Sequence, residues 1–189
     1  MRANTVIMET LYSQYQKTFV KQLQDKLSKK NVMAVPKLVK ITVNMGVKDA
    51  VSDKKSIEKM AQALAVITGQ KPKIARAKKS IATFKVREGD EIGLLVTLRG
   101  KRMYDFFERL VKVVLPRLKD FHGVKKTSFD GKGNYTLGFI EYSVFPEIDL
   151  ATVEKMQGME VSFVTTSVTN EEGFILLETL GMPFRKETK

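Results

Sequence analysis

The chain has 189 residues with 33 lysines and arginines against 21 acids, a formal net charge of +12, and no cysteine. The lack of cysteine excludes disulfides and thiolate metal sites, and a hydrophobic content of 43% indicates a globular protein and not a disordered tail. No stretch reaches the roughly 20 apolar residues that span a bilayer, and the N-terminus lacks the pattern of a secretory signal, so we expect a cytoplasmic protein without a membrane partner.

The charge is concentrated in one half of the sequence. Residues 1–100 contain 20 basic and 8 acidic residues, whereas residues 101–189 contain 13 of each. This polarised distribution is typical of a basic surface that binds a polyanion. A membrane-surface protein would carry a basic amphipathic helix with aromatic residues on its apolar face, and no segment has that arrangement. The sequence therefore favours nucleic acid as the partner.

The N-terminal third is predicted to contain two helices and one strand. Apolar residues recur every four positions over 5–30, which predicts a long amphipathic helix, and a second helix is expected from Ser52 or Asp53 to Thr68. Between them, Leu38–Asn44 alternates as a strand. We expect Val39, Ile41 and Val43 on its core face and Lys40, Thr42 and Asn44 on its polar face.

The densest cationic stretch follows the second helix. Lys71–Lys79 holds five cations and no acid, Ile81–Val86 is expected to be extended, and Ile92–Leu98 is predicted to be a buried, central strand. We therefore predict a protruding basic loop over residues 71–88.

The second half of the chain alternates helices with extended segments. A helix is predicted over Met103–Val114, ended by Pro116, and a last helix over Glu171–Leu180 with a capping box formed by Thr169 and Glu172 and a C′ residue at Gly181. Extended segments are expected at residues 135–145 and 158–166. The intervening Asp130–Asn134 has the composition of a flexible loop or of a backbone anion nest.

These elements predict an α+β fold: a mainly antiparallel sheet with helices packed on one face, forming a single compact domain over residues 1–189. No catalytic constellation is visible, because the one histidine, His122, stands in a turn without a motif and no nucleophile elbow, phosphate loop or EF-hand occurs. We expect no enzyme activity, no metal, no cofactor and no small-molecule substrate. Scarce aromatic residues around the basic stretch point to structured RNA, bound through its backbone and shape.

Six blocks resemble a known family. They are Pro36–Val47 (PKLVKITVNMGV), Thr68–Pro72 (TGQKP), Ala77–Gly89 (AKKSIATFKVREG), Val96–Gly100 (VTLRG), Ser128–Tyr135 (SFDGKGNY) and Phe145–Ile148 (FPEI). Together, and in this order, they resemble the bacterial form of the ribosomal protein L5 family, which binds 5S ribosomal RNA in the large subunit.

The resemblance implies two RNA-binding sets of residues. The positions that match 5S RNA contacts are Lys40, Thr42, Asn44, Met45, Gly46, Gln70, Lys71, Thr97 and Arg99. The positions that match a loop contacting P-site tRNA are Lys78, Lys79, Ser80, Thr83, Lys85 and Arg87. Further partners implied are large-subunit rRNA, neighbouring ribosomal proteins and a protein of the small-subunit head at an intersubunit bridge. From charge alone, a basic architectural nucleic-acid-binding protein remains the alternative.

Overall fold

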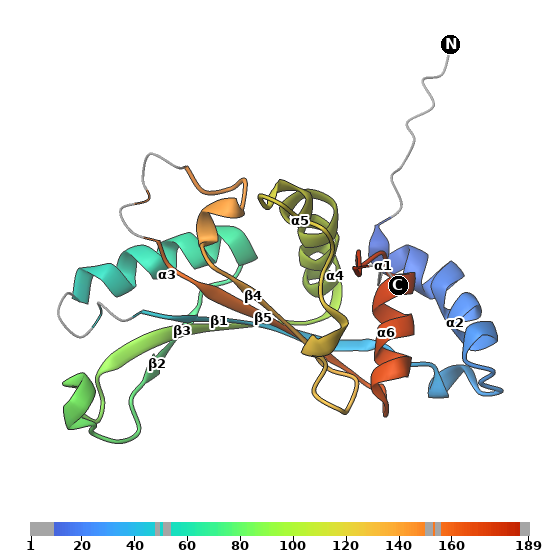
Figure 1. The fold of residues 1–189 in the computed structure, drawn as a ribbon, viewed down its shortest axis with the longest axis horizontal. Coiled ribbons are helices and arrows are strands. Elements are labelled where there is room, and N and C mark those ends of the chain that lie inside the picture. Colours follow the sequence, from blue (N-terminus) through green and yellow to red (C-terminus); the bar gives the residue numbers. More distant parts are fainter. Residues whose placement is uncertain (1–9, 48–49, 51–53, 150–152, 154–155, 186–189) are drawn as a thin grey trace, which may run out of the picture.

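A five-stranded antiparallel sheet lies at the centre of the protein (Figure 1). The computed structural model describes residues 10–47, 50, 54–149, 153 and 156–185. The strand order is β2-β3-β1-β5-β4, so that the first strand of the chain occupies the middle position. The strands are β1 (Leu38–Gly46), β2 (Lys73–Arg76), β3 (Glu91–Leu98), β4 (Tyr135–Phe139) and β5 (Met159–Thr165).

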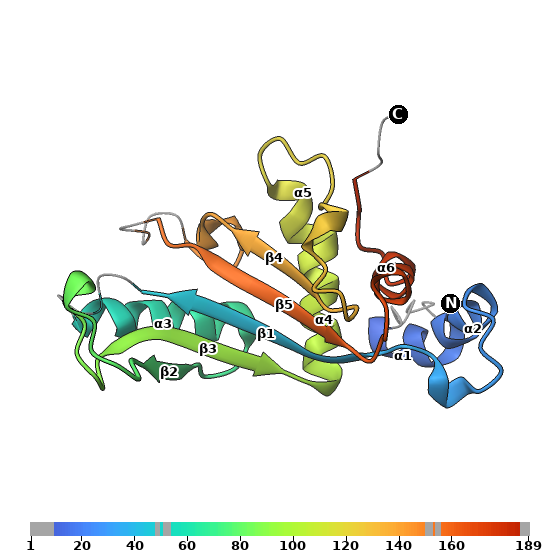
Figure 2. The same cartoon turned by 60° about the horizontal axis from the view of Figure 1, so that its bottom comes forward.

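Helices cover one face of this sheet and one of its ends. In Figure 1, α3 (Lys54–Thr68) and α4 (Gly100–Arg109) lie on the same side of the strands. A π-helical turn, Leu110–Val114, and α5 (Leu115–Arg117) continue α4. The helices α1 (Leu11–Gln14), α2 (Val20–Lys26) and α6 (Asn170–Thr179) gather at one end of the sheet (Figure 2). The predicted α+β class, with helices on one face of an antiparallel sheet in a single compact domain, is confirmed. No helix in the described part of the chain has the length and apolar character needed to span a membrane.

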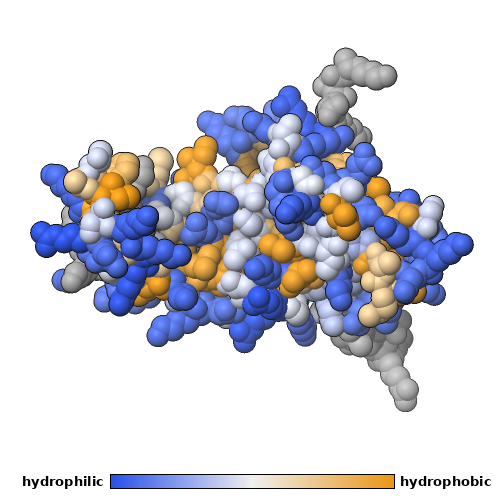
Figure 3. Space-filling model, turned by 90° about the horizontal axis from the view of Figure 1, so that it is seen from below, coloured by the Kyte–Doolittle hydropathy of each residue, from blue (hydrophilic) through white to orange (hydrophobic). Residues whose placement is uncertain are grey.

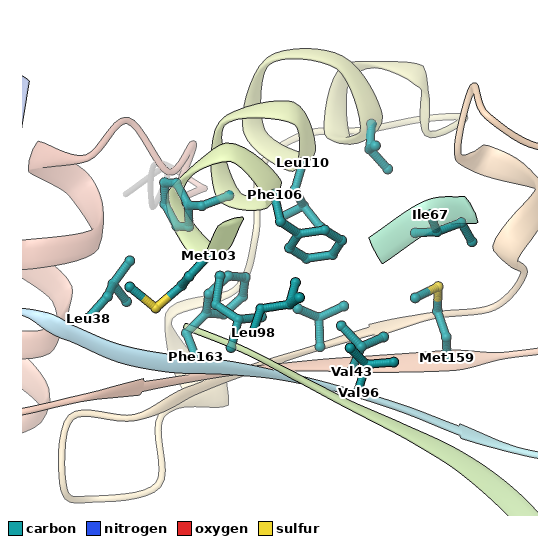
Figure 4. Close-up of a cluster of buried hydrophobic side chains, with 14 of the residues drawn as sticks. Leu38, Val43, Ile67, Val96, Leu98, Met103, Phe106, Leu110, Met159 and Phe163 are labelled. Atoms are coloured by element: carbon teal, nitrogen blue, oxygen red, sulfur yellow. The ribbon is translucent and has the colours of Figure 1, made fainter. Parts of the chain in front are cut away.

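The core lies between the sheet and the helices that cover it (Figure 4). Alternate residues of β1 point into it, and Ile41, Val43 and Met45 are fully buried. From above, α4 contributes Phe106 and Phe107, and the Phe107 ring meets Phe163 of β5 edge to face with centroids 5.6 Å apart. This layer packs the sheet against the helices and leaves its other face open.

The predicted core face of β1 is wrong at its first residue. Val39 is 40% exposed, whereas Leu38 is buried. The pairing of β1 with β5 shifts register between Leu38 and Lys40. Such a bulge inserts one extra residue, and the residues before it therefore exchange faces.

The N-terminal helix ends earlier than predicted. Within the described residues it runs through α1, a π-helical turn over Tyr15–Phe19 and α2, and it ends at Lys26 because Ser28 adopts a left-handed φ of +50°. Its predicted start at Thr5 lies outside the described residues, as do Ser52 and Asp53, the predicted cap of α3. The apolar residues that recur every four positions along this helix pack into the core, and Leu11, Tyr15 and Leu23 are buried.

The helix predicted over Met103–Val114 extends further at both ends, from Gly100 to Arg117. Helical structure continues only one residue past Pro116, to Arg117, so the proline lies in the last turn of the continuous helix.

Two predicted extended segments are only partly extended. Within Ile81–Val86, only the two end residues pair, and Ala82–Phe84 forms a 3-10 turn closed by Lys85 with a φ of +53°. The strand on this side of β3 is instead β2, which lies inside the predicted basic loop. Residues 135–145 form a strand only as far as Phe139, and Tyr142–Val144 is a 3-10 turn.

The last strand and the last helix agree with prediction. The strand predicted at residues 158–166 is β5, and it buries Val161, Phe163 and Thr165. At the start of α6, Thr169 Oγ1 accepts a hydrogen bond from the Glu172 N–H at 3.3 Å. The Glu172 carboxylate accepts from the backbone N–H of Val168 at 3.1 Å and pairs with Lys29 at 2.7 Å, and these contacts lower its pKa.

Candidate RNA interface

The sheet face opposite the helices is open (Figure 3). The strand pairings place a row of hydroxyl groups across its middle. Thr97 of β3 lies opposite Thr42 of β1, Thr42 lies opposite Ser162 of β5, and Ser162 lies opposite Thr136 of β4. Directly opposed residues of antiparallel strands project from the same face. The four hydroxyl-bearing side chains therefore form one row, roughly 14 Å long at about 4.8 Å per strand.

A second row runs beside the first and carries charge. Lys73 of β2 lies opposite Leu95 of β3, Leu95 opposite Asn44 of β1, and Asn44 opposite Glu160 of β5; Gly138 of β4 completes the row. A cation thus stands at one edge, an amide in the middle and a carboxylate beyond it. The open face presents donors and acceptors with little net charge.

Lys40 lies on the other side of the hydroxyl row. It is half-buried and pairs with Val164 of β5, one step beyond the pair of Thr42 and Ser162 on the same face. The predicted polar face of β1, with Lys40, Thr42 and Asn44, is therefore correct.

Hydrogen bonds between side chains link the two rows. Thr136 Oγ1 donates to Ser162 Oγ at 3.2 Å, and Ser162 Oγ donates to Glu160 Oε1 at 3.3 Å. The hydroxyl of Ser162 is therefore directed at the carboxylate.

Gln70 joins this surface from outside the strands. Its Nε2 donates to the backbone carbonyl oxygen of Thr97 at 3.3 Å. Since the pairing of β2 with β3 begins only at Lys73, opposite Leu95, the amide of Gln70 extends the hydrogen bonding of this edge of β3 to Thr97. The structure thus brings Gln70 and Thr97 together, although they are 27 positions apart in the sequence.

The remaining residues predicted for 5S RNA divide into three groups. Lys71 and Arg99 are exposed at the ends of β2 and β3, near Gln70 and Thr97. The carbonyl oxygen of Gly46 accepts from Gln157 Nε2 at 2.6 Å, so it is already engaged. Met45 is fully buried on the opposite face of the sheet. Its side chain does not belong to this surface, because β1 alternates there without a bulge.

The hairpin between β2 and β3 carries the second predicted set. It lies at the end of the molecule away from α1, α2 and α6 (Figure 2). The exposed residues of this set are Lys78, Lys79, Ser80, Thr83, Lys85 and Arg87. Within the described part of the chain, none of the four cations forms an ion pair with a carboxylate; the nearest ion pair, Arg76–Glu91 at 3.2 Å, lies at the base of the hairpin. These cations are therefore available to an external polyanion.

Backbone hydrogen bonds hold the hairpin in shape. The Ala77 N–H donates to the Asp90 carbonyl at 2.8 Å, and nearer the tip the Ile81 N–H donates to the Val86 carbonyl at 2.9 Å. Asp90 Oδ2 also accepts from the Arg87 N–H at 2.7 Å. Phe84 stands at the tip, 72% exposed. The hairpin is thus ordered by its own hydrogen bonds and presents an aromatic ring among cations.

The Asp130–Asn134 loop is held by internal hydrogen bonds and is not open to an external anion. The Asp130 carboxylate accepts hydrogen bonds from the N–H groups of Lys132 at 2.8 Å and Asn134 at 3.1 Å, and from Asn134 Nδ2 at 2.7 Å. These hydrogen bonds lower the pKa of Asp130. The nest that the sequence suggested is therefore filled by a side chain of the loop itself.

The described residues contain no group of three or more histidine, cysteine or acidic side chains placed to hold a metal ion. His122 is exposed and lines a pocket of about 540 Å³ with Asp120, Glu141 and Arg185. That lining contains no serine, threonine or cysteine.

Sequence reasoning missed Lys73, Thr136, Glu160 and Ser162 as members of the open face. The alternation of β5 contained the signal for two of them, because Glu160 and Ser162 are polar between the buried Met159, Val161 and Phe163. That alternation does not show which strands are neighbours in the sheet. Only the strand order places β5 against β1 and so brings these side chains to Asn44 and Thr42.

The fold and its two polar surfaces place the protein in the class of basic α+β proteins that bind nucleic acid. Comparison with known families matches residues 31–87 to the family described as Ribosomal protein L5 and residues 91–184 to the C-terminus of the same ribosomal family. The chain therefore belongs to the ribosomal protein L5 family, and it is a structural ribosomal protein and not an enzyme, as expected.

Curated relatives agree over nearly the whole length. The large ribosomal subunit protein uL5 of Streptococcus sanguinis is 56% identical over 176 residues, which cover 93% of this chain and 98% of the relative. The proteins of the same name from Prosthecochloris aestuarii and Chloroflexus aurantiacus are 52% and 53% identical, covering 94% and 93% of this chain and 90% and 97% of the relatives. The two matched segments meet within the β2–β3 hairpin, yet they share one sheet, because β1 pairs with both β3 and β5.

Proposed function

We propose that this protein is a constituent of the large ribosomal subunit that binds 5S rRNA through the open sheet face and contacts P-site tRNA through the β2–β3 hairpin. Membership of the L5 family supports the first part, since the relatives are named as large-subunit proteins. The 5S and tRNA assignments come from the resemblance, as does a bridge to a protein of the small-subunit head. The two surfaces differ in chemistry, which supports two different tasks.

The row of hydroxyls on the open face carries the 5S assignment. Thr97, Thr42, Ser162 and Thr136 present groups that both donate and accept hydrogen bonds, flanked by the amide of Asn44. Such groups suit 2′-hydroxyls, sugar oxygens and base edges, and RNA is distinguished from DNA at its 2′-hydroxyls. A surface of this kind selects RNA by geometry, whereas a purely cationic surface binds any polyanion.

Isosteric substitutions test the 5S site. Thr42→Val and Thr97→Val remove a hydroxyl and keep a β-branched shape, and Asn44→Ala removes the amide. Each is expected to weaken binding to isolated 5S rRNA about five- to tenfold, because each leaves an RNA group without its hydrogen-bond partner. Thr18→Val, on the exposed surface of the N-terminal helix, is the matched control. Unchanged affinity in all three variants would show that RNA binds elsewhere.

A salt titration tests the hairpin. Replacing Lys78, Lys79, Lys85 and Arg87 by alanine is expected to reduce the slope of log affinity against log salt for tRNA by roughly 0.7–0.9 for each phosphate that the protein no longer neutralises. Binding to 5S rRNA is expected to be much less affected. The control variant removes four exposed cations elsewhere, at Lys21, Lys30, Arg117 and Lys119. If both variants lose tRNA affinity equally, net charge and not the hairpin is responsible.

Competition with duplex DNA addresses the alternative of a general architectural protein. We expect 5S rRNA to displace the protein from duplex DNA and unrelated RNA at moderate salt, because binding through the hydroxyl row does not depend on neutralising phosphate charge. Equal competition by duplex DNA would favour the architectural function.

A further inference from the structure

A carboxylate stands beside the middle strand of the open face, on the surface proposed to bind a polyanion. Glu160 of β5 is exposed and lies directly opposite Asn44 of β1. Among the described residues, no lysine or arginine forms an ion pair with it, and the cation in its own row, Lys73, is three strands away, roughly 14 Å at about 4.8 Å per strand. The described residues therefore supply no cation that neutralises the charge of Glu160.

The position of this carboxylate is fixed. Ser162 Oγ donates to Glu160 Oε1 at 3.3 Å, and Thr136 Oγ1 donates to Ser162 Oγ at 3.2 Å. Long acidic side chains on an exposed sheet face lose rotamer entropy when they are held in this way. The hydroxyl pair thus orients one oxygen and leaves the acceptor capacity of the carboxylate facing solvent.

The space beside Glu160 is open. Its neighbour on β4 is Gly138, and a Cβ built on that residue meets no atom within 4 Å. On the other side lies Asn44, whose amide offers both a donor and an acceptor. A flat group can therefore approach the carboxylate from the side of β4 while it also contacts the amide.

The chemistry of the site selects its ligand. A carboxylate accepts hydrogen bonds and repels phosphate, so the backbone of the RNA does not cross this point. The complementary RNA group is a neutral donor, and bases supply it as the exocyclic amino groups of adenine, cytosine and guanine. In duplex RNA the amino groups of adenine and cytosine lie in the deep, narrow major groove, and that of guanine keeps one N–H in the shallow minor groove. Unpaired bases in loops and bulges present all of these groups on their Watson–Crick edges.

We propose that Glu160 and Asn44 form a base-reading pair, in which the Glu160 carboxylate accepts a hydrogen bond from the amino group of an unpaired adenine, cytosine or guanine. The proposal rests on the assignment of the open face to 5S rRNA. Ser162 acts as a positioning residue, since it contacts the carboxylate and not the base.

The direction in which one substitution changes the affinity for 5S rRNA tests this proposal. Glu160→Gln removes the charge but keeps an acceptor oxygen, and it is expected to weaken 5S rRNA binding up to about tenfold, because a charge-assisted hydrogen bond to a base becomes a neutral one. If the carboxylate were merely tolerated on a phosphate-binding face, the same change would strengthen binding. Glu178→Gln, on the exposed surface of α6, makes the same change in net charge and is the control. Thermal melting of each variant checks that the fold is intact.

Chemical probing of the bound RNA identifies the base. Kethoxal reports the Watson–Crick edge of guanine, and dimethyl sulfate reports N1 of adenine and N3 of cytosine. One of the two reagents is therefore expected to show a protected nucleotide that becomes reactive with Glu160→Gln. Ser162→Ala is expected to weaken protection of the same nucleotide partially. Weaker binding without such a nucleotide would overturn base reading. An effect of Glu160→Gln that vanishes without Mg²⁺ would also overturn it, in favour of a hydrated ion bridging to phosphate.

The variants together distinguish base reading by Glu160 from RNA binding by the open face as a whole. If Asn44→Ala and Thr97→Val weaken binding while Glu160→Gln leaves it unchanged or tighter, the face binds RNA but Glu160 reads no base. If none of these substitutions has an effect, the assignment of the face itself is wrong.

Discussion

Gly173→Ala is expected to destabilise the protein, although the same change stabilises most helices. Gly173 lies inside α6, where alanine is favoured over glycine by about 1 kcal/mol. However, a Cβ at this position would stand 2.5 Å from the carbonyl oxygen of Gly133 and 2.9 Å from its Cα. Since ordinary contacts begin at 3.4 Å, helix and loop must separate by about 0.9 Å.

The loop cannot retreat freely. Thr165 Oγ1 donates to the Gly133 carbonyl at 2.9 Å, and Asn170 Oδ1 accepts from the Gly133 N–H at 3.2 Å. Overpacking costs about 1–3 kcal/mol, and a buried hydrogen bond broken by the separation costs about 1 kcal/mol more. After subtraction of the helix propensity, the net loss is about 1–3 kcal/mol. In a chain of this length that corresponds to roughly 2–12 °C in Tm.

The assay is thermal unfolding followed by circular dichroism, with urea unfolding as a second measure. Gly138→Ala is the control, because a Cβ there meets nothing within 4 Å, and its Tm is expected to change little. A Gly173→Ala protein with a raised Tm would refute the reasoning, since only helix propensity would then be acting.

Three further predictions concern titration and packing. Burial raises the pKa of Tyr135 to about 12, so the folded protein retains a proton that the unfolded chain loses near pH 10. The free energy of unfolding is therefore expected to fall as pH rises from 10 to 12, by up to about 1.4 kcal/mol per pH unit for this residue. In urea unfolding, Tyr135→Phe is expected to lose less stability over this pH range than the unchanged protein. The lowered pKa of Asp130 acts in the opposite direction, because its contribution to stability is present above the ordinary pKa of 3.8 and is lost as pH falls below it. Asp130→Asn is expected to lower the Tm at pH 7 and to make the Tm less dependent on pH in acid. An unchanged dependence of Tm on acid pH would show that the hydrogen bonds to Asp130 do not stabilise the fold. Arg109 pairs with Glu147 and donates to the carbonyl oxygen of Ile67, and both charged side chains are partly exposed. Arg109→Met is therefore expected to cost about 1–2 kcal/mol in urea unfolding, and a loss below about 0.5 kcal/mol would contradict a stabilising role of these contacts.

Local patterns predicted much of the fold. The alternation of β5, the capping of α6 by Thr169 and the stripe of the N-terminal helix are correct, because they depend on periodicity and on hydrogen bonds between residues close in sequence. The prediction fails where one residue changes the local geometry. The bulge near Val39 and the left-handed backbone of Lys85 are such cases. Neither valine nor lysine favours these backbone conformations, so the residue type does not predict them.

The candidate site shows the same division. The sequence by itself determined that the chain is basic in one half, that β1 has a polar face with Lys40, Thr42 and Asn44, and that the hairpin is cationic. Only the tertiary structure decided what lies beside that face. Strand order is set by packing between segments far apart in the chain, and it brings Thr97, Ser162 and Glu160 to β1. A single strand shows which way its side chains point but not which neighbours they meet, and recognition depends on those neighbours.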